Sequence, residues 1–252
     1  MRSTRGRKCI TTLSSSAQVN SDRKILSTSF LYPLIISVCI IKLGPAGLSA
    51  AIKLKQLGIS RNREISVCVV EKGAEVGAHI LSGNVFETTA LDELFPDWSR
   101  DPDVPLKTKA QTDSFKILTS DKGYISVPHF LTPPELNNEG NYIISLSQLV
   151  RWLATKAEEL GVEIYPGFAA SEVLYGEAGE VIGIATKDAG IGKDGVQKGS
   201  YTQGIELRAR QTLFAEGARG SCSEEVIEKF KLRDGKDVQS YGKYDSLLRT
   251  QF

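Results

Sequence analysis

Residues 34–48 read LIISVCIIKLGPAGL, and this stretch decides the fold that we expect of the chain. The apolar, β-branched run Leu34–Ile41 is typical of a strand that is buried on both faces. A turn rich in small residues follows, and Pro45 suits the first turn of a helix. The helix continues to Gly58, a residue type that often ends helices. The sequence therefore predicts a strand, a tight turn and a helix in direct succession.

The next segment completes a βαβ unit. Ile65–Val70 (ISVCVV) predicts a second buried strand, and Glu71 follows it directly. The dinucleotide-binding fingerprint G-x-G-x-x-G has the same order and ends in an acid that binds ribose hydroxyls. Its second glycine lets backbone approach a pyrophosphate and its third lets helix and strand pack closely, and Gly44 and Gly47 hold these places. The helix N-terminus adds free N–H groups for the phosphates.

The first place of the fingerprint holds Lys42 instead of glycine. A lysine brings a Cβ atom and a long side chain to a point where the backbone bends sharply. This departure predicts either a clash in the turn or an ammonium group that swings toward the phosphates. On these residues alone, an ordinary βαβ turn that binds nothing stays open as the alternative.

The rest of the chain alternates loops with short elements. Prolines break the stretch 97–141, which we expect to be a peripheral insert of short strands and loops. An apolar stripe predicts a helix over Ser147–Leu160. Asp188–Gln203 is rich in Gly and Lys and predicts a hairpin excursion, and Thr212–Ala215 predicts a buried strand. Val162–Tyr165 predicts a further short strand. Three more strands are expected to form a small antiparallel layer: Glu172–Tyr175, Val181–Thr186 and Ile205–Arg210.

Composition excludes several classes of protein. The chain has 252 residues, 41% of them hydrophobic and 24% charged, with a net charge of +1, so a basic surface for nucleic acid is not expected. The four cysteines are scattered without a CxxC pair, so no metal or iron–sulfur site is expected among them. Cys39 and Cys68 lie in apolar runs and are expected to pack as small hydrophobic residues. The run Phe30–Ile41 is too short to span a membrane.

The N-terminus has the composition of an organelle transit peptide. Arg2, Arg5, Arg7 and Lys8 come before the first acidic residue, Asp22, and hydroxyl residues lie between them. We expect a mitochondrial transit segment over 1–29, with a disordered basic tail as the alternative.

Long segments of the chain resemble one known family, electron-transfer flavoprotein:ubiquinone oxidoreductase. The resemblance runs from about Gly44 to Gly242, and its most distinctive stretches are GPAGLSAAIKLKQLG (44–58), GAHILSG (77–83), AEELGVEIYPGFAASEVL (157–174) and LFAEGARGSCSE (213–224). It implies an α/β, FAD-binding Rossmann-like fold of the two-dinucleotide-binding, glutathione-reductase-like type, with an antiparallel β layer and incomplete at the C-terminus. The FAD-binding domain would cover 30–242, and 243–252 would be a divergent tail.

The resemblance also implies a function. It predicts an enzyme that passes electrons from reduced electron-transfer flavoprotein to ubiquinone at the matrix side of the mitochondrial inner membrane. The cofactor would be FAD, whose own chemistry requires no catalytic side chain. The family's 4Fe–4S cluster belongs to a C-terminal ferredoxin-like domain, and its ligands have no counterpart in these residues. We therefore expect a truncated chain, which the missing domain would leave inactive.

The resemblance assigns cofactor-binding roles to eleven residues. They are Gly44, Pro45, Ala46 and Gly47 at the pyrophosphate; Glu71 with Lys72 at the adenosine ribose; Gly77, Ser82 and Gly83 toward the flavin; Val173 at the adenine through its backbone; and Gly217 near the ribityl chain.

The segment Gly77–Trp98 resembles the part of the family that dips into the membrane surface. Its apolar residues would form a face that contacts the membrane interface; these residues are Leu81, Val85, Phe86, Leu91, Leu94, Phe95 and Trp98. The alternative is a core helix that packs the same residues inward. His79 lies in the same segment and contacts either the cofactor or the fold. His129, in a Pro-rich loop, is expected to be incidental.

Other functions stay open beside this one. The chain is alternatively a non-catalytic fragment that binds FAD weakly or not at all. Another two-lobed flavoprotein, such as a geranylgeranyl-reductase-like enzyme, would share the general fold. A nicotinamide-binding Rossmann dehydrogenase is the weakest alternative, because GAHILSG and AEGARG do not fit it.

Overall fold

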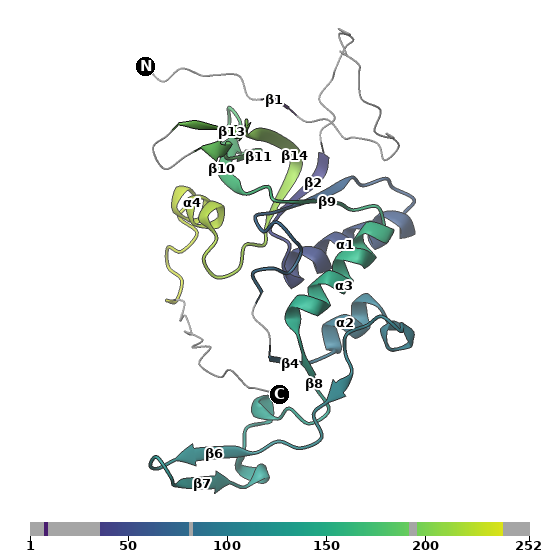
Figure 1. Cartoon of the computed structure of the whole chain (residues 1–252), viewed down its shortest axis with the longest axis vertical. Coiled ribbons are helices and arrows are strands. Elements are labelled where there is room, and N and C mark those ends of the chain that lie inside the picture. The colour runs from purple at the N-terminus through teal and green to yellow at the C-terminus, as the bar shows by residue number, and fades with distance from the viewer. Residues whose placement is uncertain (1–7, 10–35, 81–82, 192–195, 239–252) are drawn as a thin grey trace.

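The chain is described by a computed structural model that covers residues 8–9, 36–80, 83–191 and 196–238. Its centre is one mixed sheet of seven strands in the order β10-β11-β14-β2-β3-β9, with β1 paired to β14 (Figure 1). The strands are β1 (Lys8–Cys9), β2 (Ile36–Ile41), β3 (Val67–Glu71), β9 (Glu163–Pro166), β10 (Ala170–Tyr175), β11 (Val181–Thr186) and β14 (Ile205–Phe214).

The predicted βαβ unit is confirmed. Strands β2 and β3 are parallel neighbours, with Val38 opposite Val67 and Ile41 opposite Val70. Helix α1 (Pro45–Ser60) connects them across one face of the sheet. Both strands are buried on both faces, as a continuous β-branched run predicts, because successive side chains of a strand point to opposite sides.

One correction concerns β14. The sequence predicted two strands, Ile205–Arg210 in a separate antiparallel layer and the buried Thr212–Ala215, but the structure has a single strand of 10 residues. Its first half pairs antiparallel with β11 and its second half pairs parallel with β2, so the antiparallel strands belong to the main sheet. The end of β14 is also not buried: Leu213 is 38% exposed, and Phe214 lines a cavity at this edge of the sheet.

The two faces of the sheet carry different helices. Val38, Ile40, Val67 and Val69 face α1 and α3 (Leu146–Glu159), the helix that the apolar stripe predicted. The alternate residues of β2 and β3 point to the other face of the sheet. There they pack into a second hydrophobic core, which includes Cys222 of α4 (Ser221–Lys229). Figure 1 accordingly shows α4 apart from the other helices.

Two neighbouring cysteines lie in this second core. Cys39 and Cys68 are register partners on β2 and β3, and both are free and fully buried. The hydrogen bond with Cys39, together with burial, raises the pKa of Cys68. Both side chains pack in an apolar cluster, which confirms the prediction that they behave as small hydrophobic residues.

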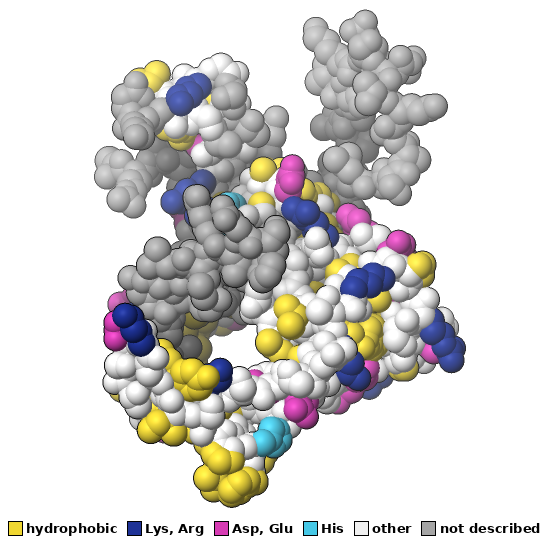
Figure 2. All heavy atoms as spheres, turned by 60° about the horizontal axis from the view of Figure 1, so that its bottom comes forward, with side chains coloured by type: hydrophobic (Ala, Val, Ile, Leu, Met, Phe, Trp, Pro, Cys, Tyr) yellow, Lys and Arg dark blue, Asp and Glu magenta, His cyan; other side chains and the backbone are white. Residues whose placement is uncertain are grey.

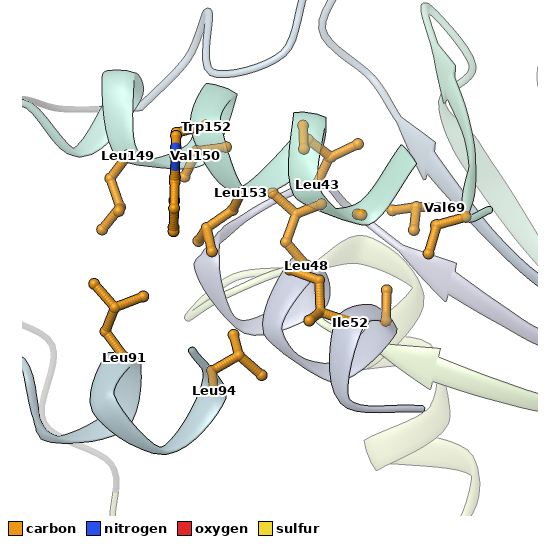
Figure 3. Packing of buried hydrophobic residues seen from close by; sticks show 14 of the residues in the cluster. Leu43, Leu48, Ile52, Val69, Leu91, Leu94, Leu149, Val150, Trp152 and Leu153 are labelled. Atoms are coloured by element: carbon orange, nitrogen blue, oxygen red, sulfur yellow. The ribbon is translucent and has the colours of Figure 1, made fainter. Parts of the chain in front are cut away.

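The apolar residues of the segment Gly77–Trp98 mostly face inward, which corrects the interfacial face expected there. Leu91, Leu94 and Trp98 are buried in the core, and Phe86 and Phe95 pack against it. Figure 3 shows Leu91 and Leu94 of α2 (Thr89–Leu94) pointing toward Leu149 and Leu153 of α3. The alternative of a core helix is therefore the correct one, because α3 offers an apolar face at this position.

The stretch 97–141 is only partly the peripheral insert that was expected, because Trp98, Val104 and Leu106 near its beginning are buried in the core. Its later part extends away from the sheet at the lower end of Figure 1. Its hairpin and its last two 3-10 helices lie beyond a small sheet of order β4-β8-β5. These elements are β4 (Asn84–Phe86), η1 (Trp98–Arg100), β5 (Thr108–Lys109), β6 (Phe115–Leu118), β7 (Tyr124–Val127), η2 (His129–Leu131), η3 (Pro134–Leu136) and β8 (Tyr142–Ile144). A second hairpin, β12 (Ala189–Ile191) with β13 (Gln197–Thr202), lies in the predicted excursion.

Some expectations concern residues that the structure does not describe. The transit segment 1–29, apart from Lys8–Cys9, the tail 243–252, Leu81 and Ser82 all lie outside the described ranges. Within those ranges, no helix combines the length and the apolar character needed to cross a bilayer.

The burial of α2 gives a direct test. We expect Leu91→Ala to lower the free energy of unfolding by about 2–4 kcal/mol, because it leaves a cavity between α2 and α3. Urea unfolding of the ligand-free protein measures the loss. Val85→Ala is the matched control, because Val85 is 47% exposed, and it should stay within about 0.5 kcal/mol of the parent. Equal effects of the two substitutions would contradict the inward packing.

Candidate functional site

A cavity of about 470 Å³ lies where β2, β3 and β14 end. In sheets of this kind, ligands bind in the crevice at the carboxyl ends of the parallel strands. Four segments far apart in sequence form its wall: Lys42–Ala46, Glu71, Gly77–Ile80 and Phe214–Gly217. We refer to this space as the turn cavity.

The N-terminus of α1 opens onto the turn cavity. Gly44 is the N-cap residue, Pro45 takes the first helical position, and no side chain caps the helix by a hydrogen bond. The first N–H groups of a helix have no partner within it, and the helix dipole makes this end attractive to anions. The position is therefore suited to a phosphate group.

The two glycines of the turn have different surroundings. A Cβ atom on Gly44 would meet no atom within 4 Å, so this backbone is open to a ligand in the cavity. A Cβ atom on Gly47 would lie 2.5 Å from the carbonyl oxygen of Lys42 and close to side chains of Ile40 and Ala215. Gly47 thus permits the close packing of helix and sheet, and Gly44 permits the approach of a ligand. These surroundings agree with the roles that the fingerprint gives to its third and second glycines.

Lys42 adopts the backbone conformation of a glycine. Its φ is +78°, in the left-handed region that residues with a Cβ atom rarely occupy. Its N–H donates to the carbonyl oxygen of Val70 at 2.8 Å, which fixes the turn to the end of β3. Its ammonium group donates to the carbonyl oxygen of Glu216 at 3.1 Å. The side chain therefore neither clashes in the turn nor points to the helix N-terminus, and it reaches the chain after β14.

Glu71 holds the turn from the other side. Its side chain is buried, and its two carboxylate oxygens accept hydrogen bonds from the N–H groups of Leu43, at 2.9 Å, and Gly73, at 2.7 Å. A carboxylate has about four lone-pair positions, so each oxygen keeps capacity for one more donor. A hydroxyl group in the turn cavity is the kind of donor that this arrangement suits.

A second cavity, of about 290 Å³, adjoins the first. We call it the outer cavity; Lys42 and Glu216 line both. Its wall brings together aromatic, small and basic residues from three parts of the chain, among them Lys72, Phe168–Ala170 and Arg219–Ser221. The two cavities together follow the carboxyl edge of the sheet, which is the shape that an extended ligand requires.

Glu216 organises the boundary of the two cavities. Its Oε2 atom accepts hydrogen bonds from the N–H and the hydroxyl of Ser223, at 2.7 and 2.8 Å, which fixes the first turn of α4. Gly220 packs so closely against Glu216 that a Cβ atom there would overlap its side chain. Sequence reasoning missed Glu216, although its place after a predicted strand in AEGARG was the available signal.

The structure brings most of the predicted residues together. Gly44, Pro45, Ala46, Glu71, Gly77 and Gly217 line the turn cavity, as does His79, and Gly47 lies behind the turn. Lys72 lines the outer cavity. Gly83, with a φ of +86°, and Val173, buried in β10, line neither cavity.

Two further observations concern other possible sites. His129 lines a separate cavity in the insert, with Asp113 and Asn138, and takes no part in the turn cavity. Among the residues that the structure describes, no three His, Cys, Asp or Glu side chains come together in a way that would hold a metal ion.

Comparison with known proteins gives a consistent result. The chain is 54% identical over 221 residues to the mitochondrial electron transfer flavoprotein-ubiquinone oxidoreductase of Arabidopsis thaliana, covering 88% of this chain and 34% of that protein. The same-named proteins of Pseudomonas aeruginosa (56% over 206 residues) and Mus musculus (51% over 205 residues) match 81% of this chain and 37% and 33% of their own lengths. The resemblance seen in the sequence is thus confirmed, although the chain spans only about a third of these relatives.

Solved structures support the fold alone. The chondrochloren halogenase CndH, a myxobacterial FAD-dependent halogenase, aligns with a TM-score of 0.50 at 17% identity, over 76% of this chain and 39% of that one. No protein-family model matches the chain.

The difference between the two glycines predicts different costs of adding a methyl group. Gly47→Ala should lower the free energy of unfolding by about 2 kcal/mol, because its Cβ atom meets rigid backbone. Gly44→Ala should cost only about 0.5 kcal/mol, the order of an unfavourable N-cap residue. Thermal and urea unfolding of both variants without ligand measure the difference. A Gly44 variant as unstable as the Gly47 variant would refute the assignment.

Proposed function

We propose that this chain, which matches about a third of the length of electron transfer flavoprotein-ubiquinone oxidoreductases, forms the FAD site of an enzyme of that kind. The observation that carries the proposal is the uncapped N-terminus of α1 facing a cavity, with Gly44 open to a ligand and Glu71 at the end of the next strand. Identities of 51–56% over four fifths of the chain or more support it independently.

The residues of the two cavities fit the parts of FAD. The pyrophosphate would lie at the N-terminus of α1, beside Gly44, Pro45 and Ala46. The adenosine ribose would donate hydroxyl hydrogens to Glu71, and Lys72 would border the adenosine side in the outer cavity. The flavin side would extend past Gly77 and Gly217, with His79 in the same wall. Bound FAD would supply the electron-transfer chemistry.

The side chains of this chain would bind and orient the cofactor. Glu71 serves two purposes, since the hydrogen bonds that fix the turn also aim its carboxylate at the cavity. Glu216 keeps α4 against the outer cavity through Ser223 and so holds the wall that would cover the adenosine. The described residues of both cavities offer binding and orientation, which is the protein's share in flavin catalysis.

The proposal extends to the reaction of the complete enzyme. Electrons would pass from reduced electron-transfer flavoprotein to ubiquinone, at the matrix side of the mitochondrial inner membrane. The names of the plant and mouse relatives support the mitochondrion as the compartment, whereas the name of the bacterial relative does not include it.

FAD binding is the decisive test. We expect the purified chain, incubated with FAD and freed of excess, to show a bound-flavin absorption spectrum. Gly44→Ala should weaken binding roughly tenfold or more, because its Cβ atom takes space that the pyrophosphate requires. Gly199→Ala is the matched control, since Gly199 also has open space around it but lies on β13, away from both cavities. A colourless protein, or a Gly44 variant that binds like the parent, would reject the site.

The remaining partner is a membrane surface, and we propose that a different segment from the one expected contacts it. Leu91, Leu94 and Trp98 of the expected segment are buried in the core, whereas exposed apolar side chains gather around the β6–β7 hairpin. Figure 2 shows apolar side chains at this end of the molecule. We name as the hairpin patch the exposed residues Phe115, Ile117, Leu118, Tyr124, Ile125, Phe130 and Leu131.

The chemistry of the hairpin patch suits a lipid surface. Ile117 and Ile125 are register partners on β6 and β7, so their side chains lie on one face of the hairpin. Lys116 and Lys122 outnumber Asp121 in the same hairpin, which leaves a net positive charge that anionic headgroups attract. Apolar and aromatic residues with flanking lysines are the composition of a segment that inserts into the interfacial layer.

Vesicle binding tests this assignment. The double variant Ile117→Ser with Ile125→Ser should lose most of its co-sedimentation with vesicles of phosphatidylcholine and an anionic phospholipid. Its thermal stability should be unchanged, because both side chains are at least half exposed. Ile59→Ser, an exposed position on α1, is the control and should bind like the parent. Undiminished binding by the double variant would exclude the hairpin patch.

A further inference from the structure

We propose that the imidazole ring of His79 binds the adenosine ribose of the cofactor together with Glu71, as a hydrogen-bond donor beside the acceptor oxygens of the carboxylate. The inference rests on the proposed FAD site and deepens it, because the dinucleotide fingerprint gives His79 no role. It also names the part of the ligand that His79 contacts, which is the ribose and not the flavin ring.

The loop after β3 brings His79 back toward the end of that strand. Gly77 has a φ of +78°, in the left-handed region, and the N–H groups of Ala78 and Ile80 each donate to a carbonyl oxygen three residues earlier. Helix α3 anchors the loop, because the hydroxyl of Ser147 donates to the carbonyl oxygen of Gly77 at 2.9 Å. The position of His79 is therefore set by a tight turn that is attached to the core helix.

The ring of His79 lies close to the carboxylate of Glu71, above Gly73. A Cβ atom on Gly73 would be 3.1 Å from the Nδ1 atom of His79 and 3.2 Å from the Oε1 atom of Glu71. The N–H of Gly73 donates to the same Oε1 atom at 2.7 Å, which fixes that oxygen. Both side chains line the turn cavity. An imidazole and a carboxylate thus border one small space in its wall.

The two side chains have complementary hydrogen-bonding capacity. An ionised carboxylate only accepts hydrogen bonds, whereas an imidazole has at least one N–H that donates. A ribose hydroxyl does both, so it can donate to Glu71 and accept from His79. The fingerprint places the ribose hydroxyls at the acid that ends the second strand, which brings them to the space that His79 borders.

His79 is also available for a ligand. Its side chain is exposed, and neither ring nitrogen forms a hydrogen bond with the part of the chain that the structure describes. The other basic side chain of the cavity wall is Lys42, and its ammonium group already donates to the carbonyl oxygen of Glu216 at 3.1 Å. Among the described residues of this wall, His79 is therefore the side-chain donor that remains for a ligand.

The experiment compares FAD with ADP, which carries the same adenosine ribose and a pyrophosphate but no flavin. The parent, His79→Leu, His79→Gln and His129→Leu are titrated with FAD, and flavin fluorescence gives each Kd. Displacement of bound FAD gives the Kd of ADP. Glutamine keeps an N–H donor and leucine does not. His129→Leu is the matched control, because it removes an imidazole that lies in the insert, away from the turn cavity.

The expected result is an equal loss of affinity for both ligands. His79→Leu should weaken FAD and ADP alike by roughly five- to tenfold, the effect of one hydrogen bond. His79→Gln should stay within about threefold of the parent, and His129→Leu should bind both ligands like the parent. Thermal unfolding without ligand should be unchanged in all four proteins, which separates loss of a ligand contact from damage to the loop.

The other outcomes decide against the inference in distinct ways. Weaker FAD binding by His79→Leu with unchanged ADP binding would assign His79 to the flavin side and overturn the proposal. Unchanged binding of both ligands, a loss in His79→Gln as large as in His79→Leu, or failure of ADP to displace FAD from the parent would also overturn it. If the parent binds no FAD at all, the proposed flavin site itself is refuted.

Discussion

The structure depends on one close contact, between the start of α1 and the end of β2. Gly47 has no side chain, and this allows the helix to lie against the carbonyl of Lys42 at a distance that a Cβ atom would prevent. The contact places the N-terminus of α1 at the carboxyl edge of the sheet and directs its unpaired N–H groups into the turn cavity. Glu71 stabilises the same turn by binding the backbone of Leu43 and Gly73. The core on this face and the candidate site therefore share one geometric origin.

Local sequence patterns predicted the elements that lie near this contact. The continuous β-branched runs of β2 and β3 indicate strands buried on both faces, and the apolar stripe of α3 indicates a helix buried on one side. The same reasoning failed where a neighbour distant in sequence determines the pairing or the burial of an element. Strand β14 changes partner from β11 to β2 along its length, and no local signal shows that its two halves are continuous. The apolar side of α2 was ambiguous for the same reason, since its burial depends on α3, more than one element away.

The candidate site shows the same division. The glycines, Glu71 and their spacing were readable from the sequence because the βαβ unit is contiguous. The contribution of Glu216 was not, because it meets Lys42 across 174 residues of sequence. Lys42 itself was recognised as a departure from the pattern, but the partner of its ammonium group depends on where β14 ends. Residue types at a turn thus indicate the class of ligand, whereas distant strands determine how much room that ligand has.

The late position of β14 in the chain has a consequence for folding. The wall that Phe214–Gly217 gives to the turn cavity exists only after β14 has paired with β2, and this pairing closes a loop of well over a hundred residues. Contacts of such long sequence separation form slowly, since the entropy of loop closure is lost before the contacts are gained. A nucleotide would therefore meet a complete site only at the end of folding. A nucleotide bound at the complete site would stabilise the native state by mass action.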